Sequence, residues 1–140
     1  MDLLKLFLQP IREHKMFVLV ACVLIVLDVV FGFTNAALKR EISSKKMREG
    51  LQHKLGSIFL MCTASVIDSA FMGGIDLGFD APVLAATCVY IAVMEVISVL
   101  ENICKLNPQL ADNPLIGLFA KRLHSVENTA EVEITEIGEL

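Results

Sequence analysis

The sequence predicts an all-α membrane protein with about three transmembrane helices. Of its 140 residues, 55% are apolar, and the mean hydropathy is +0.65. A soluble domain usually holds about 45–50% apolar residues even when Gly is counted. The excess lies in three blocks, 16–38, 55–79 and 82–104, separated by charged or Gly/Pro-containing breaks. Each block carries an acid near its middle: Asp28, Asp68 and Glu95.

The block at 16–38 is long enough to cross a bilayer. As a helix that rises about 1.5 Å per residue it extends roughly 34 Å, whereas a hydrocarbon core is about 30 Å thick. It contains 14 Leu, Ile, Val or Phe residues. Together these favour insertion by about 4–8 kcal/mol, and the central acid Asp28 costs about 2.5–3.5 kcal/mol. The apolar residues outweigh the acid, so the block is expected to insert.

The blocks at 55–79 and 82–104 are closer to break-even, because each has only 10 such apolar residues against one acid near its centre. We therefore expect both to need packing partners. In the second block Ser65, Ser69 and Gly73 recur every four residues, a small-residue pattern that allows helices to approach closely. In the third block, four polar residues share one helix face: Thr87, Glu95, Ser98 and Asn102.

The segments outside the blocks are polar or amphipathic. Residues 1–15 are expected to form an interfacial amphipathic segment that is interrupted at Pro10. The link at 39–54 has a net charge of +4 and no aromatic residue, which favours a solvated link beside anionic headgroups over a nucleic-acid surface. Its bases are Lys39, Arg40, Lys45, Lys46, Arg48 and Lys54. Residues 105–140 are expected to form a cytoplasmic C-terminal region, with a short amphipathic helix at 115–124 and a disordered acidic tail.

The distribution of bases predicts an orientation. Three spans place the first link and the C-terminal region on one side of the membrane, with nine bases, and the N-terminal segment on the other, with three. Because the more basic side faces the cytoplasm, we expect the N-terminus outside and the C-terminus inside.

The three central acids are the main clue to function. With these block boundaries they fall in the middle third of the bilayer, and no Lys, Arg or His shares their layer, so ion pairing within the spans is not expected. They could be protonated and hydrogen-bonded across packed helices, or they could face water. We infer a switch between these dry and wet states; the alternative is that the acids only fix helix register. The candidates for lining a pore or packing helices are Asp28, Gly32, Asn35, Ser65, Asp68, Ser69, Thr87, Glu95, Ser98, Glu101 and Asn102.

The residues indicate neither an enzyme nor a cofactor or metal site. Cys22, Cys62, Cys88 and Cys104 form no CxxC or Cys/His spacing. The three histidines lie on polar flanks, far apart in the sequence. Gly73–Gly74 lacks the Lys-Ser/Thr that follows a phosphate-binding glycine loop.

Two motifs carry a resemblance to a known family. The first reads DVVFGFTNAALKREISSK from Asp28, with Gly32 and Ser44 inside it, followed by Gly50 and Lys54; the second reads EVISVLEN and holds Glu95, Ser98, Glu101 and Asn102. Together they resemble the phage lysis holins related to the toxin-secretion holins of clostridia. The resemblance implies a homo-oligomer in the host's cytoplasmic membrane. Its lesions would let a cytosolic endolysin, or in clostridia a toxin, cross.

Two other functions are compatible with the same residues. A non-conducting membrane scaffold or accessory subunit would use the acids to hydrogen-bond a partner protein, and would not be toxic when overproduced. A narrow proton or cation pathway would leak ions while proteins stay inside. A holin is expected to assemble through its small-residue faces and release folded protein abruptly.

Overall fold

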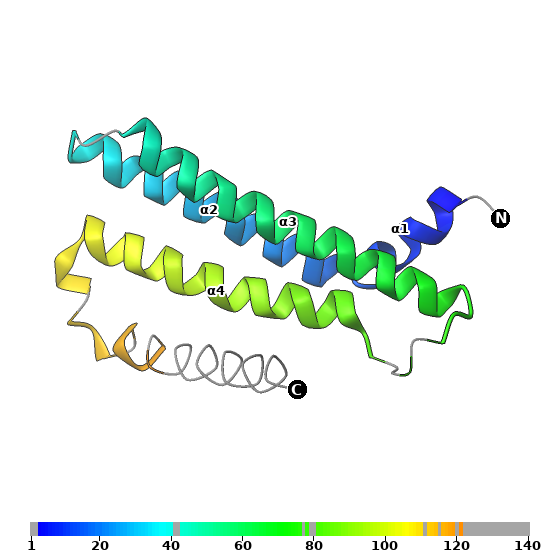
Figure 1. Ribbon diagram of the computed structural model, residues 1–140. Helices are drawn as coiled ribbons and strands as arrows, with labels where there is room; N and C mark the ends of the chain where they lie inside the picture. Colours follow the sequence, from blue (N-terminus) through cyan, green and yellow to red (C-terminus); the bar gives the residue numbers. More distant parts are fainter. Residues whose placement is uncertain are drawn as a thin grey trace, which may run out of the picture.

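The structure, a computed structural model, describes residues 3–40, 43–76, 78, 81–110, 112–114, 116–119 and 121. Within these ranges the chain is helical, with no strand. The elements are α1 (Leu3–Glu13), α2 (Lys15–Leu38), α3 (Ser44–Met72), α4 (Val83–Leu106) and the short 3-10 helix η1 (Pro108–Leu110). Helices α2, α3 and α4 alternate in direction, and α1 lies near one end of the bundle (Figure 1). We call the end at which α2 turns into α3 the inner end, and the opposite end the outer end.

The all-α membrane fold predicted from the sequence is confirmed. Three helices are long and apolar enough to cross a membrane: Lys15–Leu38, Met47–Met72 and Val83–Leu106. The first and third agree closely with the predicted blocks at 16–38 and 82–104. The acidic tail and most of the helix expected at 115–124 lie outside the described residues.

The second helix is displaced from the predicted block at 55–79. It starts at Ser44, because the residues of the basic link are mostly good helix formers and none of them is a proline. It ends at Met72, just before Gly73 and the left-handed Gly74, whose φ is +82°. Most of the predicted basic link is therefore helix, and only residues 39–43 join α2 to α3.

Helix α1 is not interrupted at Pro10, contrary to the expectation for residues 1–15. It continues through this buried proline to Glu13. Proline lacks an N–H and so leaves the carbonyl of Leu6 without its helical donor. The Ser69 hydroxyl of α3 shares its one proton between that carbonyl, at 3.2 Å, and the Ser65 carbonyl, at 2.7 Å, which compensates in part for the missing bond. The helix is thus held against α3.

The helices associate in two pairs, α2 with α4 and α1 with α3. Helices α2 and α4 make the most extensive contact in the molecule, whereas α3 packs against α4 and α1. Although few residues join them, α2 and α3 touch little. Because each pair is joined to the other along the α3–α4 seam, that seam closes the bundle.

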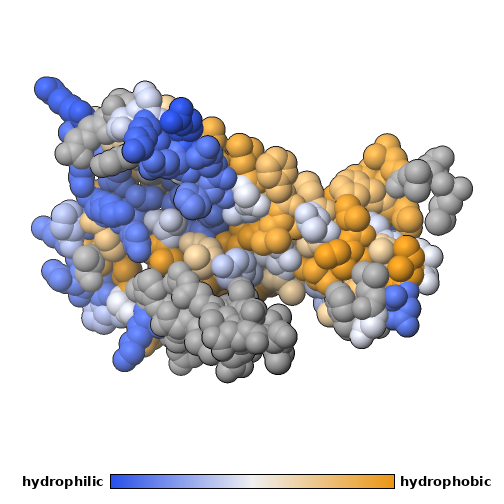
Figure 2. Space-filling model, viewed as in Figure 1, coloured by the Kyte–Doolittle hydropathy of each residue, from blue (hydrophilic) through white to orange (hydrophobic). Residues whose placement is uncertain are grey.

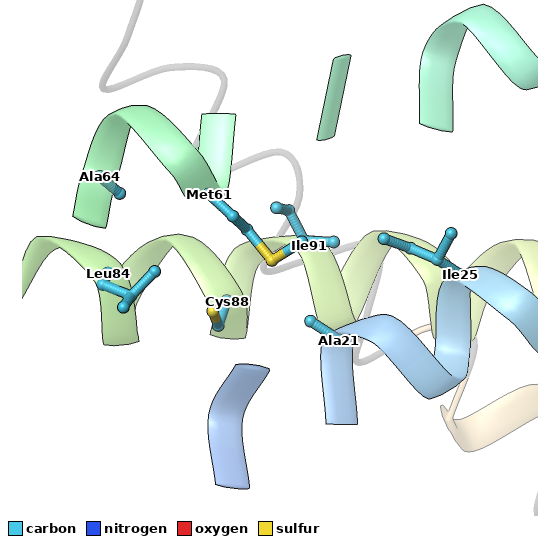
Figure 3. Close-up of a cluster of buried hydrophobic side chains, with 7 residues drawn as sticks. All are labelled: Ala21, Ile25, Met61, Ala64, Leu84, Cys88 and Ile91. Carbon is cyan, nitrogen blue, oxygen red and sulfur yellow. The ribbon is translucent and has the colours of Figure 1, made fainter. Parts of the chain in front are cut away.

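An apolar cluster fills the outer half of the bundle. Met61 of α3 extends toward Cys88 and Ile91 of α4, with Ala21 and Ile25 of α2 beside them (Figure 3). Ala64 and Leu84 complete the cluster on the outer side. Most large apolar side chains on the outside of the helices are exposed, as expected for a surface that faces lipid.

Hydrophilic residues gather at the inner end of the molecule and extend over the first turns of α3, whereas hydrophobic residues cover most of the remainder of the visible face (Figure 2). The exposed bases Lys39, Arg40, Lys45 and Arg48 belong to this inner region. The first turns of α3 therefore suit water or lipid headgroups, whereas the rest of the helix suits the hydrocarbon core.

Candidate functional site

Lys54 joins three helices through two buried acids. Its Nζ lies 2.9 Å from Asp28 Oδ2 on α2, and it donates a hydrogen bond to Glu95 Oε2 on α4. The side chain of Lys54 is itself largely buried. Since α3 otherwise touches α2 little, this lysine is a principal link between those two helices.

Two amides extend the network toward the inner end. The Nδ2 of Asn102 donates to Asp28 Oδ1 at 2.9 Å. The Nδ2 of Asn35 donates to the Asn102 carbonyl at 2.9 Å and to its Oδ1 at 3.2 Å. Asn35 follows Asp28, and Asn102 follows Glu95, by two helical turns, so each pair projects from one face of its helix. The network is therefore a polar stripe shared by α2 and α4, with Lys54 across it.

The network contains more acidic groups than basic ones. Asp28 is 9%, Glu95 4% and Asn35 7% exposed. Two carboxyl groups share one lysine, and Asn35 Oδ1 is buried without a partner among the described residues. Buried ions are tolerated only when paired and hydrogen-bonded, and an unpaired polar atom costs free energy. The interior is thus held together by groups that water would also satisfy.

The expectation that ion pairing within the spans is absent is wrong. It followed from starting the second span at residue 55, which left Lys54 in a surface link. In the structure Lys54 lies well inside α3. Asp28 and Lys54 are equally distant in sequence from the middle of the 39–43 link, so antiparallel packing brings them level. That symmetry is a sequence signal that could have identified the pair.

The predicted block at 55–79 puts Asp68 near the middle of its span, whereas in the structure it lies near the outer end of α3. Because α3 ends at Met72, Asp68 lies one turn from its outer end. Its carboxylate accepts from the N–H of Val83 at 2.9 Å and of Leu84 at 3.0 Å. These are the first two amides of α4, which have no partner inside their own helix. Asp68 therefore caps α4 from a neighbouring helix.

The small-residue face of α3 packs against α1 within one chain. Ser65 donates to the carbonyl of Phe7 at 3.1 Å, and Ser69 to that of Leu6 at 3.2 Å. A side chain at Gly73 would reach Leu6 at an ordinary contact distance of 3.8 Å. In this conformation the face is covered by α1, so a second copy could reach it only after α1 moves away.

The other candidates lie around the network. Gly32 lies beside Asn102: a Cβ there would be 3.8 Å from the Asn102 Nδ2. Thr87 and Ser98 are half-buried on α4 and take no part in the network. Glu101 is exposed, with its Oε2 3.8 Å from the Nζ of Lys105. Of the basic candidates, Lys54 is in the network; the side chain of Lys46 lies outside the described set.

An apolar groove of about 410 Å³ runs between α2 and α4 and has no polar wall. Met16, Phe17, Val20 and Leu24 line it from α2. Cys88, Val89, Ala92, Val93 and Val96 line it from α4. Within the part of the chain that the structure describes, no three His, Cys, Asp or Glu residues are grouped so as to hold a metal. The polar network is thus the part of the bundle with distinctive chemistry.

The bundle has two halves along its length. On the inner side, the polar stripe on α2 and α4 lies against the hydrophilic first turns of α3. On the outer side, the apolar cluster around Met61 and Cys88 fills the space between the same helices. A single bundle is therefore polar inside at one end and closed by apolar side chains at the other.

These features define a multi-pass α-helical membrane protein with a buried network of polar and charged residues. A family model for the bacteriophage holin family matches residues 11–113, most of the chain, and the chain belongs to that family. The match covers all three candidate spans and every residue of the network. The family is not enzymatic in general. No curated protein and no solved structure matches the chain.

Proposed function

We propose that the chain assembles with itself in the host's cytoplasmic membrane and forms lesions through which a cytosolic endolysin, or a secreted toxin, crosses. The family and the three apolar helices support a holin-like membrane protein. The lesion, the homo-oligomer and the cargo are the proposed steps.

The observation that carries the proposal is the buried network. A protein that only needed to span the membrane would gain nothing from Asp28, Lys54 and Glu95, because apolar residues of similar size are often as stable or more stable in such positions. Intramembrane ionisable residues are rare and mark polar pathways. Residues that satisfy one another in the closed bundle can face water in an open assembly. The network then supplies the polar groups that line the lumen of the open assembly.

The single bundle explains why assembly is needed. Its apolar cluster occupies the outer half of the helix interface, and three helices enclose too little space for a protein to pass. A lesion large enough for an enzyme must therefore have walls made of many chains. Such walls would present the α2–α4 stripe, with Asp28, Glu95 and Ser98, to the water.

The orientation proposed is N-terminus out and C-terminus in. It places the exposed bases of the inner end at the cytoplasmic surface, beside anionic headgroups. The hydrophilic first turns of α3 then reach the network from the cytoplasmic side, where the endolysin or toxin is located before it crosses.

The test is inducible expression in bacteria that also contain a cytosolic muralytic enzyme, with culture turbidity followed over time. The proposal predicts an abrupt fall in turbidity that needs both proteins. Matched cultures that produce either protein alone are the controls. Normal growth with the protein present in the membrane would support a scaffold instead. Slow growth arrest without lysis would indicate a narrow ion pathway.

A further inference from the structure

We infer that α3, together with α1, is the part of the bundle that moves when the lesion opens, while α2 and α4 stay paired. The inference rests on the proposed function, because it names how the same polar network becomes exposed. It follows from three separate observations: how the helices pack, where polar bonds cross the seam, and where the chain can bend.

The packing divides the bundle unequally. Helices α2 and α4 make the most extensive contact in the bundle, whereas α3 makes a smaller contact with α4 and touches α2 little. Helix α1 goes with α3, because Ser65 and Ser69 donate to its Phe7 and Leu6 carbonyls. Separating α1–α3 from α2–α4 therefore breaks less contact than separating α2 from α4.

Polar side chains hold the two pairs together at two places. At the inner half Lys54 of α3 bonds to Asp28 and Glu95. At the outer end Asp68 of α3 bonds to the first amides of α4. Between them, among the described residues, the buried apolar cluster that includes Met61 and Ala64 of α3 and Leu84, Cys88 and Ile91 of α4 closes the seam (Figure 3). Water can replace both polar links, since each joins groups that it solvates well.

The joints of the chain lie where this movement needs them. The link between α2 and α3 contains Arg40 at a φ of +52°, a left-handed conformation that is strained for a residue with a side chain. The connection from α3 to α4 contains Gly74 and Gly78, both at φ +82°. Helices α1 and α2 meet at the single turn residue His14. The α1–α3 pair can thus swing as a unit without unwinding a span.

The movement exposes the polar stripe of α2–α4 and leaves its own bonds intact. Asn102 still donates to Asp28, and Asn35 to Asn102, because all three belong to the pair that stays together. Asp28 and Glu95 lose Lys54 and gain water. The same step removes Met61 and Ala64 from the apolar cluster, which opens the outer half.

Disulfide locks test this directly. The gate lock carries Met61→Cys with native Cys88, which joins α3 to α4, in a chain in which Cys22, Cys62 and Cys104 are replaced by Ser. The control lock carries Ala21→Cys with Cys88 in the same background, which joins α2 to α4. All three positions belong to the apolar cluster, so the two locks perturb the same region. Each is expressed with a muralytic enzyme, with copper phenanthroline as oxidant, and each disulfide is verified on non-reducing gels.

The oxidised gate lock should abolish lysis, and dithiothreitol should restore it, whereas the oxidised control lock should lyse cells on the unchanged schedule. A fully cross-linked gate lock that lyses normally would overturn the inference, as would loss of lysis in both oxidised locks. A second gate pair, Ala64→Cys with Leu84→Cys in a Cys88→Ala chain, decides the matter if the first folds poorly. Cells that never lyse with the unsubstituted chain contradict the proposed function itself.

Discussion

At the scale of single residues, one lysine accounts for much of how the bundle closes. Lys54 neutralises part of the charge of Asp28 and Glu95 and bridges helices that otherwise have little contact. An ion pair that is removed from water costs desolvation energy, so its presence is weak support for stability and stronger support for a role in a second state. The same three residues lie within the two motifs that resemble phage holins.

We expect Lys54→Met to destabilise the folded bundle by about 3–5 kcal/mol, because it leaves Asp28 and Glu95 buried without a base. Thermal unfolding in detergent micelles, followed by circular dichroism, measures the loss. The triple change Lys54→Met, Asp28→Asn, Glu95→Gln removes all three charges and should recover most of the stability. Equal stability of the single variant and the parent would show that the network is not closed in the folded protein.

Asp68→Ala should lower the free energy of unfolding by about 0.5–2 kcal/mol, the usual cost of losing a helix cap. The physical reason is that the amides of Val83 and Leu84 lose their acceptor. The matched control is Glu101→Ala, which removes an exposed acid whose 3.8 Å ion pair contributes little. The midpoint of thermal unfolding should fall for Asp68→Ala alone; identical midpoints in the two variants would refute the capping role.

At the scale of whole helices, a hydrogen bond from α3 to α1 replaces one that a proline removes from α1. Pro10 removes a donor from α1, and Ser69 supplies another from α3. Hydrogen bonds between helices in membranes contribute about 0.6 kcal/mol on average. Because this one also orders a terminal helix, its loss should appear locally more than globally.

Ser69→Ala should therefore raise hydrogen exchange in α1 with little change in α2 and α4. The variant loses the bond to Leu6 and also the 2.7 Å bond from Ser69 to the Ser65 carbonyl. Thr63→Ala is the control, because the Thr63 hydroxyl donates to the Phe59 carbonyl in its own helix and the residue is exposed. Hydrogen exchange is measured by mass spectrometry in detergent. Equal exchange of the α1 amides in the two variants would contradict the attachment of α1 to α3.

The sequence predicted α2 and α4 well and α3 poorly, for a definite reason. Apolar content marks where a helix enters lipid, and α2 and α4 begin and end close to those points. Helix α3 extends well beyond its apolar part, through Lys45 and Arg48, and apolar content carries no information about that extension. The ion pair was missed along with the boundary. Its partners become neighbours only through the register of two antiparallel helices.

Part of the network could be predicted and part could not. Asp28, Asn35, Glu95 and Asn102 stand out as polar residues in apolar blocks, and all four take part. Asp68 stands out in the same way, yet it acts as a cap, because its role depends on where α4 begins relative to α3. Composition identifies which polar residues are unusual. Contacts between helices decide what each one does.

At the scale of the whole molecule, three spans place the two ends of the membrane domain on opposite sides. Helix α2 begins at the outer end, and α4 finishes at the inner end (Figure 1). With nine bases in the regions that share the inner side and three in the N-terminal segment, the inner end should face the cytoplasm.

Fusion of reporter proteins checks this orientation. A green fluorescent protein fused after the C-terminus should fluoresce, because it folds in the cytoplasm, and an alkaline phosphatase at the same place should be inactive. Replacing Lys39, Arg40, Lys45 and Arg48 by Gln removes much of the charge difference and should weaken the preference. Active phosphatase on the unaltered chain would show that the C-terminus lies outside, which is the opposite of the proposed orientation.

The central claim is that this chain alone makes openings wide enough for a folded protein. The most direct measurement is release from vesicles made with anionic phospholipids, into which purified protein is inserted at increasing density, with a small dye and a folded fluorescent protein trapped together. We predict that above a threshold density both are released at the same time. Release of the dye alone, or of neither at any density, would contradict the claim.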